Sequence, residues 1–226
     1  MNKKRLAVLV TLIAIPCIVL LGIFAFKDKL YAFISVVVAV LSCVPFFAAF
    51  ERKEQGTIKL VMLAAMIGLS VAGRLVFAAI PGFKPVTALV VLCAIYFGGE
   101  AAFMTGALTA LISNFYFGQG PWTPFQMFAW GMLGFVAGMM AEKLQKSKVM
   151  LSIYGALAGV FFSLVMDVWT TLWWDGSFNA ARYLTNIAAA LPLTLEYAIS
   201  NVIFLLLLAK PIGTMLERIK LKYGIE

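Results

Sequence analysis

Residues 57–80 read TIKLVMLAAMIGLSVAGRLVFAAI, and the only charged side chains in this stretch are Lys59 and Arg74. A helix that crosses a membrane needs about 20 mostly apolar residues, because hydrocarbon offers no partner to a backbone N–H or C=O group. The stretch therefore predicts a transmembrane helix.

The sequence on both sides of this stretch has the same character. Apolar runs of similar length occupy residues 5–26, 30–50, 100–117, 124–141, 149–173 and 187–209. A shorter run, 86–97, lies between a turn at 81–85 and the Gly98-Gly99 pair, and a helix packed inside protein can be shorter than one that faces lipid. We read the first run as a helix rather than a signal peptide, because it is long and no small-x-small cleavage site precedes Lys27. The sequence thus predicts an all-α integral membrane protein with eight helices, or seven if 86–97 does not span.

The composition excludes most other classes of protein. The 226 residues are 63% hydrophobic and 12% charged, with a mean hydropathy of +1.00, whereas a soluble domain is nearer half apolar and a quarter charged. The chain has no histidine, which excludes Ser-His-Asp triads and imidazole metal sites. Its three cysteines are isolated in apolar runs, and it has no GxxxxGK[ST] loop for ATP. We expect no catalytic residues, no metal site and no covalently bound cofactor.

The basic residues predict the orientation of the chain. With the N-terminus in the cytoplasm, the inner segments hold 13 of the 18 Lys and Arg residues. The other five are Lys27, Lys29, Arg74, Lys84 and Arg182. Cytoplasmic loops of membrane proteins carry such an excess, so both termini are predicted to be cytoplasmic. This placement explains the net charge of +8 without nucleic-acid binding.

The unusual polar residues gather in the segments predicted to face outward. Segments 81–85, 114–123 and 174–186, with the adjoining helix ends, combine amides, charges and aromatic rings on one side of the membrane. An interfacial belt of Trp and Tyr is the alternative explanation, but it does not explain the amides and charges. We therefore predict an outward-facing ligand pocket. Its candidate residues are Arg74, Phe83, Lys84, Asn114, Tyr116, Gln119, Trp122, Gln126, Trp130, Asp167, Thr170, Trp174, Asn179, Arg182, Tyr183 and Asn186.

Two carboxylates within predicted helices need partners. A charged group inside a membrane is costly unless it is paired or faces water, and Arg74 and Arg182 are the candidate partners of Asp167. Glu196 is expected to pair inside the bundle or to join the pocket from below, and we favour pairing. Glu100, by contrast, is expected to be solvated or to cap a helix.

Small residues form stripes on two predicted helices. Ala64, Gly68 and Ala72 recur at every fourth position beside Ala65, and Gly155 and Gly159 have the same spacing. Such stripes bring helices close together. They can serve packing inside the bundle or the docking of another subunit, and the sequence leaves both alternatives open.

These features resemble the substrate-binding (S) components of energy-coupling factor (ECF) transporters, and most closely the cobalamin (vitamin B12) type. The resemblance rests on the runs RLVFAAIPGFKP (74–85) and SNFYFGQGPWTPFQMFAWG (113–131), and it covers about residues 57–210. It implies a six-helix core at 57–210. The two additional N-terminal helices predicted within 1–56 depart from the family pattern, because many S components lack them, and a basic cytoplasmic tail is predicted at 211–226. The resemblance also implies a multi-pass protein of the bacterial cell membrane.

The resemblance further implies a function. The chain would capture cobalamin outside the cell and work with an ECF transmembrane (T) subunit and two ATPase subunits, with Ala64, Ala65, Gly68 and Ala72 docking the partner. Without histidine, the vitamin would keep its own axial base, and amides would surround the corrin: Asn114, Gln119, Gln126, Asn179 and Asn186.

The alternatives are an S component for another vitamin or precursor (riboflavin, pyridoxine, a queuosine precursor), a membrane enzyme, or a self-contained carrier. The chain offers no carboxylate cluster for an enzyme, and we find no convincing internal repeat of the kind that many carriers have.

Overall fold

The computed structural model describes residues 41, 56–176 and 178–224. This part is all-helical, with α4 at Thr57–Val76, α5 at Val86–Phe97, α6 at Gly99–Phe117, α7 at Thr123–Met139, α8 at Ala141–Lys146, α9 at Lys148–Asp175 and α10 at Ala180–Tyr223. The predicted helices 5–26 and 30–50 lie outside the described residues except for Leu41, which is helical and packs against the hydrophobic core.

The described helices support an α-helical, multi-pass membrane protein. Three of them, α4, α9 and α10, are long and apolar enough to cross a membrane, and α5 is a shorter apolar helix. Apart from the six-residue α8, the described helices follow the six predicted core runs in order. The total of eight spans stays a prediction, because it also depends on residues 5–26 and 30–50.

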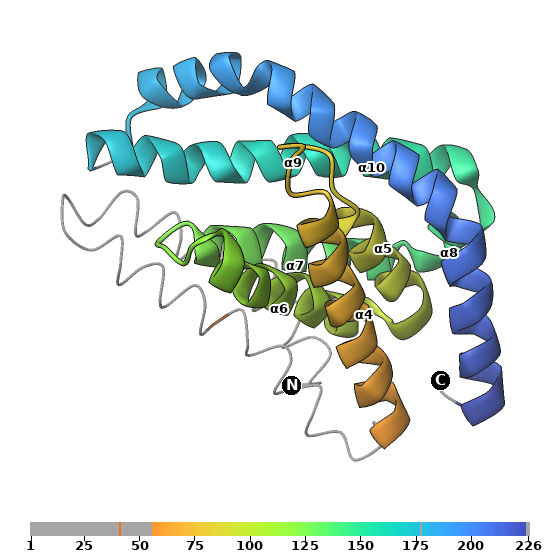
Figure 1. The fold of residues 1–226 in the computed structure, drawn as a ribbon. Helices are drawn as coiled ribbons and strands as arrows, with labels where there is room; N and C mark the ends of the chain where they lie inside the picture. Colours follow the sequence, from red (N-terminus) through yellow and green to blue (C-terminus); the bar gives the residue numbers. More distant parts are fainter. Residues whose placement is uncertain (1–40, 42–55, 177, 225–226) are drawn as a thin grey trace, which may run out of the picture.

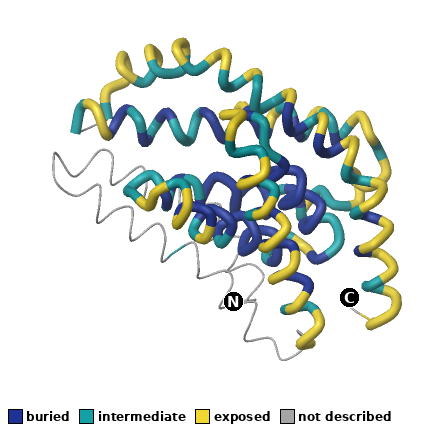
Figure 2. Tube along the Cα trace, in the orientation of Figure 1, coloured by how far each residue is buried: buried dark blue, intermediate teal, exposed yellow. Residues whose placement is uncertain are grey.

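The centre of the molecule is built from α5, α6 and α7 (Figures 1 and 2). Ten of the twelve residues of α5 are buried, so this short helix is covered by protein on nearly all sides. Glycines allow α6 and α7 to touch. A Cβ atom at Gly106 would lie 2.5 Å from the backbone of Trp130, and one at Gly134 would lie 2.7 Å from the carbonyl oxygen of Ala102. Small residues therefore set the spacing of these two helices, as expected for membrane bundles.

Helices α9 and α10 form a long pair that packs along the core (Figure 1). The Gly155 and Gly159 stripe lies at their interface, where added Cβ atoms would meet Leu205 at 2.6 Å and the backbone nitrogen of Ala198 at 2.5 Å. This stripe thus serves packing inside the bundle. In Figure 1, α4 and the C-terminal part of α10 run steeply across the direction of α9.

The end of α4 and the start of α10 differ from the predicted ranges. α4 ends at Val76 rather than 80, because residues 77–80 form turns ahead of Pro81-Gly82. α10 begins seven residues before the predicted 187, because the Asn179 side chain accepts hydrogen bonds from the first free N–H groups, those of Ala181 and Arg182.

The other end of α10 extends far beyond the predicted residue 209. The helix continues through Pro211 to Tyr223, where Gly224 ends it with a φ of 59°. A proline inside a helix removes one hydrogen bond and bends the helix but does not have to end it. Leu216 is fully buried in this last part, and an added Cβ at Gly213 would lie 2.5 Å from the Tyr96 hydroxyl, so the segment packs on the core.

Candidate functional site

Arg74 lies at the centre of the polar group that connects three helices. It stands in the last turn of α4, and only 7% of its surface is exposed. Its Nη1 donates hydrogen bonds to Ser113 Oγ and to Asn114 Oδ1, the latter at 2.8 Å. A buried guanidinium is stable only when its donors find acceptors, and α6 supplies two of them.

Asn114 continues the network from α6 to α7. It is fully buried, accepts from Arg74, and donates through Nδ2 to Thr123 Oγ1 and Gln126 Oε1, each at 2.8 Å. Thr123 in turn donates to Gln119 Oε1 at 3.0 Å, and Gln119 Nε2 donates to the carbonyl oxygen of Leu111 at 2.7 Å. The amides and hydroxyls therefore form one connected group at the α6–α7 turn.

Aromatic rings enclose this group. The guanidinium carbon of Arg74 lies 4.4 Å from the centre of the Phe117 ring and 5.0 Å from that of Trp130. Trp130 stacks on Phe162 of α9 at 5.0 Å and 17°, and Phe162 meets the edge of Tyr197 of α10 at 5.1 Å. The cation is thus held between ring faces, an arrangement that attracts it electrostatically.

Some buried polar atoms have no hydrogen-bond partner. Within the described ranges these are Ser70 Oγ, Arg74 Nε and Asp167 Oδ2. Buried polar atoms are nearly always paired, and an exception calls for an explanation such as a ligand. Arg74 Nε is a donor and Asp167 Oδ2, when ionised, an acceptor, so the two offer complementary contacts.

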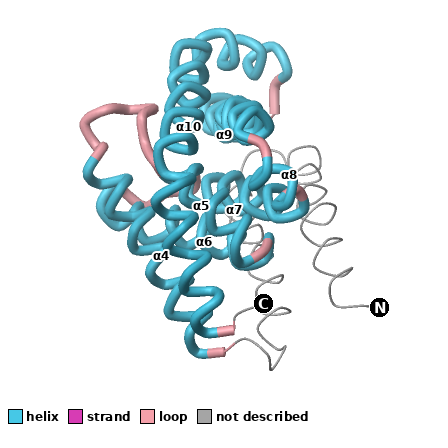
Figure 3. The backbone as a smooth tube through the Cα atoms, turned by 90° about the vertical axis from the view of Figure 1, so that its right-hand side faces the viewer, coloured by secondary structure: helices cyan, strands magenta, loops and turns pink. Residues whose placement is uncertain are grey.

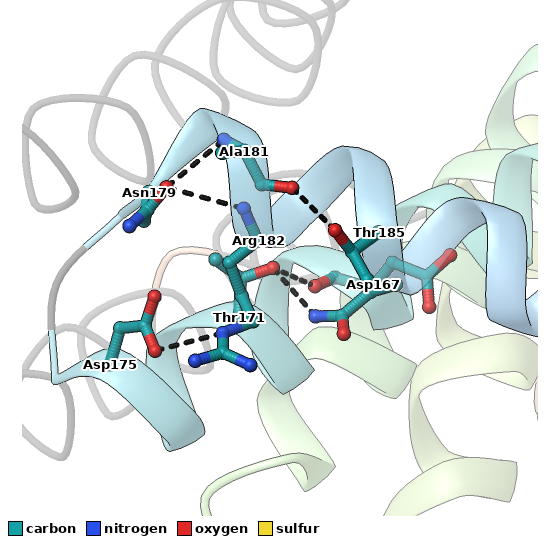
Figure 4. Close-up of polar contacts among 8 residues, drawn as sticks. Asp167, Thr171, Asp175, Asn179, Ala181, Arg182 and Thr185 are labelled. Atoms are coloured by element: carbon teal, nitrogen blue, oxygen red, sulfur yellow. Dashed lines mark hydrogen bonds and ion pairs between the residues drawn. The ribbon is translucent and has the colours of Figure 1, made fainter.

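A second polar group joins the ends of α9 and α10 (Figure 4). Asn186 Nδ2 donates to Thr171 Oγ1 at 3.0 Å, and Thr171 donates to the carbonyl oxygen of Asp167 at 2.8 Å. Arg182 pairs with Asp175 at 2.9 Å. In Figure 4 the Asp167 carboxylate and the Arg182 guanidinium lie on opposite sides of the group. Neither predicted partner thus binds Asp167, because Arg182 reaches the nearer Asp175 across the turn and Arg74 bonds to α6.

The 77–85 loop packs against the middle of α10. The ring of Phe83 lies 4.8 Å from that of Phe204, and the backbone N–H of Lys84 donates to Ser200 Oγ at 3.0 Å. The Lys84 ammonium donates to the carbonyls of Ile80 and Pro81. Burial, and then the charge of Arg74, hold the pKa of Lys84 below its ordinary value of 10.5, while Glu196 acts in the opposite direction. Lys84 therefore stabilises its own loop.

Glu196 lies beside the same loop. An added Cβ at Gly82 would stand 2.9 Å from its carboxyl group, and the charge of Glu196 acts on Lys84. The Lys84 ammonium bonds to the carbonyls of Ile80 and Pro81 rather than to this carboxylate, so the pairing of Glu196 inside the bundle stays a prediction.

The remaining candidate residues divide between the two groups and the outer surface. The ring of Trp122 lies 6.4 Å from that of Trp169, which links the α6–α7 turn to α9. The Thr170 hydroxyl donates to the Met166 carbonyl, and the Tyr183 hydroxyl to that of Leu164. Tyr116 and Trp174 are 71% and 68% exposed, and Asn179 caps α10. The structure therefore brings together Arg74, Asn114, Gln119, Gln126 and Trp130, and places Asp167, Thr170, Arg182, Tyr183 and Asn186 along the α9–α10 pair.

Sequence reasoning missed several members of the central group: Ser113, Phe117, Thr123, Phe162 and Tyr197. Ser113 and Phe117 are one helical turn apart, and that spacing is a usable signal once Asn114 is suspected. Phe162 and Tyr197 lie in apolar runs and give no signal of their own.

The small-residue stripe of α4 faces away from the described bundle. Ala64, Ala65, Gly68 and Ala72 are all exposed, and a Cβ added at Gly68 would meet nothing within 4 Å. The stripe therefore differs from that of α9, which is covered by α10.

Comparison with known proteins identifies the family. Residues 54–218 match the family model described as "ECF-type riboflavin transporter, S component". No curated protein and no solved structure matches the chain. The match does not confirm the cobalamin type, since the family description names riboflavin. The family consists of transporter subunits rather than enzymes, and such subunits work with a T subunit and ATPases. The chain belongs to the family of S components of ECF transporters, and is a vitamin-binding, membrane-embedded transporter subunit.

Proposed function

We propose that this chain captures riboflavin on the outer side of a bacterial membrane and delivers it to a T subunit driven by two ATPase subunits. The family description supports the choice of vitamin. The observation that carries the proposal is Arg74, held between the rings of Phe117 and Trp130 and bonded to Asn114.

The chemistry of a flavin suits this arrangement. Its ring system is flat, and one edge carries two carbonyl oxygens on either side of an N–H group. Aromatic faces stack on flat rings. The unpaired Arg74 Nε is a donor for a carbonyl, and the Gln126 side chain, whose Oε1 accepts from Asn114, offers its Nε2 as a further donor. Arg74, Gln126 and Trp130 are therefore the proposed flavin-binding residues.

Cobalamin fits the arrangement less well. The amides expected to surround a corrin do not form one ring: Asn114, Gln119 and Gln126 share a compact network, whereas Asn179 caps α10 and Asn186 bonds to Thr171. Cobalamin remains the second ligand to test.

The exposed stripe supports the proposed partner contact. Ala64, Gly68 and Ala72 are exposed on α4, and no described residue lies within 4 Å of a Cβ added at Gly68. Small residues allow another helix to approach closely, so this surface is the proposed docking site for the T subunit.

Equilibrium binding to the purified full chain tests the ligand. Riboflavin, cobalamin, biotin and thiamine are titrated separately, and we expect saturable, submicromolar binding of riboflavin with quenching of flavin fluorescence. Trp130→Phe should weaken binding because it shortens the ring that holds the Arg74 guanidinium in place. Trp173→Phe is the matched control, since Trp173 is 55% exposed. If cobalamin alone binds tightly, cobalamin takes the place of riboflavin as the proposed ligand. If none of the vitamins binds, the result contradicts the proposed capture function.

A further inference from the structure

An apolar groove lies between α7 and α9, away from the polar groups described above. Its volume is about 420 Å³. It is lined by Met132, Leu133, Val136, Met140, Met150, Ile153, Tyr154, Leu157, Ala158 and Phe161. The one hydroxyl among these side chains, that of Tyr154, donates to the Leu133 carbonyl. The groove therefore presents no free polar group to an occupant.

The groove is open at its side. Ile153 and Leu157 are 49% and 62% exposed, although both line it. In a membrane these exposed side chains face hydrocarbon, so an apolar occupant can enter laterally.

The length of the groove matches one leaflet of a bilayer. Its α9 wall runs from Met150 to Phe161, which at 1.5 Å per residue is about 16 Å. The hydrocarbon core of a bilayer is about 30 Å thick, so each leaflet contributes about half. An acyl chain of a phospholipid fills a groove of this length.

One end of the groove carries positive charge. The lining residues Met140 and Met150 flank the segment 141–149, which includes α8 and connects α7 to α9 (Figure 3). Lys143, Lys146 and Lys148 are all exposed there, and the single acid, Glu142, pairs with Lys146 at 2.5 Å. Lys143 and Lys148 thus remain available to an anion. The positive-inside pattern predicts that this end lies in the cytoplasmic leaflet, where anionic lipids attract lysines.

We propose that the α7–α9 groove binds an anionic phospholipid, with one acyl chain along Met150–Phe161 and the headgroup phosphate at Lys143 and Lys148. The apolar lining favours the acyl chain of the lipid, and the two lysines favour a negatively charged headgroup. This site is separate from the vitamin site and does not depend on the identity of the vitamin.

Native mass spectrometry of the full-length chain in mild detergent tests the proposal. Phosphatidylglycerol, phosphatidylcholine with the same acyl chains, and glycerol 3-phosphate are added separately. We expect one retained phosphatidylglycerol, little phosphatidylcholine and no glycerol 3-phosphate. Lys143→Gln with Lys148→Gln should reduce retention at least fivefold. The matched control is Lys210→Gln with Lys222→Gln, which removes the same charge from exposed positions on α10 and should leave retention unchanged.

A second pair of variants tests the groove itself. Ile153→Gln with Leu157→Gln makes its wall polar and should lower retention. Ile203→Gln with Leu207→Gln changes two apolar side chains on α10 that are 37% and 64% exposed, and it serves as the control. A thermal melt of each variant confirms folding. Any of three results would overturn the proposal. The Lys143/Lys148 variant could retain as much phosphatidylglycerol as the wild type, or the wild type could retain phosphatidylcholine as well as phosphatidylglycerol. The third result is an equal loss of retention in the Ile153/Leu157 variant and in its Ile203/Leu207 control.

Discussion

At the scale of single residues, Arg74 and Asn114 decide how the candidate site is organised. Each contacts groups from another helix, and Asn114 uses both its carbonyl oxygen and its amide nitrogen. Removal of either side chain leaves buried partners unsatisfied, and that loss costs more than the hydrogen bond contributes.

The substitution Arg74→Lys tests the shape of the cation as well as its charge. Lysine keeps the positive charge but lacks the planar fork that bonds two acceptors and lies over a ring. We expect riboflavin affinity to fall by about tenfold or more, which corresponds to the loss of one charged hydrogen bond. Fluorescence titration measures the change. Arg182→Lys, at an exposed ion pair, should change affinity less than about twofold. Unchanged affinity in Arg74→Lys would remove this residue from the site.

The residue scale is also where prediction from sequence reached its limit. Arg74, Asn114 and Gln126 could be named as candidates because polar residues are rare in apolar runs. Their connections could not be named, since Arg74 and Asn114 are 40 positions apart and the rotation of each helix decides which side chains meet. The same reason explains the error over Asp167, whose two candidate partners bond elsewhere, Arg74 to α6 and Arg182 to Asp175.

At the scale of helices, the two small-residue stripes have opposite environments. The stripe of α9 is pressed against α10, whereas the stripe of α4 is open. Sequence spacing is the same in both, so only the fold separates a packing surface from a free one.

Gly159→Ala tests the packed stripe. The added Cβ would stand 2.5 Å from the backbone nitrogen of Ala198, and that atom cannot move without shifting α10. Such overpacking costs about 1–3 kcal/mol, so we expect a clear fall in melting temperature. In Gly68→Ala the Cβ meets nothing within 4 Å, and its melting temperature should stay equal or rise. A fall in Gly68→Ala alone would mean that the assignment of the two stripes is reversed.

Gly68→Leu tests the open stripe. The larger side chain projects from an exposed position, so fold and riboflavin binding should persist while another helix can no longer approach. Co-purification with the T subunit and the ATPases should therefore drop at least severalfold. Ala189→Leu, at an exposed small residue on α10, is the matched control. Normal assembly of Gly68→Leu would exclude this surface from docking.

Most helix limits could be read from the sequence, and the exceptions have physical causes. α5 matches its predicted range, because Pro85 and Gly98 mark both ends. α10 does not, because an Asn cap begins it early and its later residues are too polar to be read as a span. Hydropathy identifies the apolar part of a helix but not the polar turns that continue it.

At the scale of the whole molecule, charge placement predicts the orientation in the membrane. An epitope inserted after Gly118, in the α6–α7 turn, should be accessible to antibody on intact cells. An epitope after the last residue should become accessible only when the cells are permeabilised, because both termini are predicted to be cytoplasmic. Flow cytometry compares the two. The reverse pattern of accessibility would mean that the predicted orientation is wrong and that the vitamin site lies on the cytoplasmic side.

The packing of α10 also has a consequence for biosynthesis. A chain emerges from the ribosome with its N-terminus first, yet Ser200 bonds to Lys84 across 116 positions, and the buried Leu216 lies still later along α10. The earlier helices are therefore made before the surfaces that Ser200 and Leu216 contact are covered. The bundle closes only after α10 has been made and inserted, and until then the side of α5 that α10 contacts stays open.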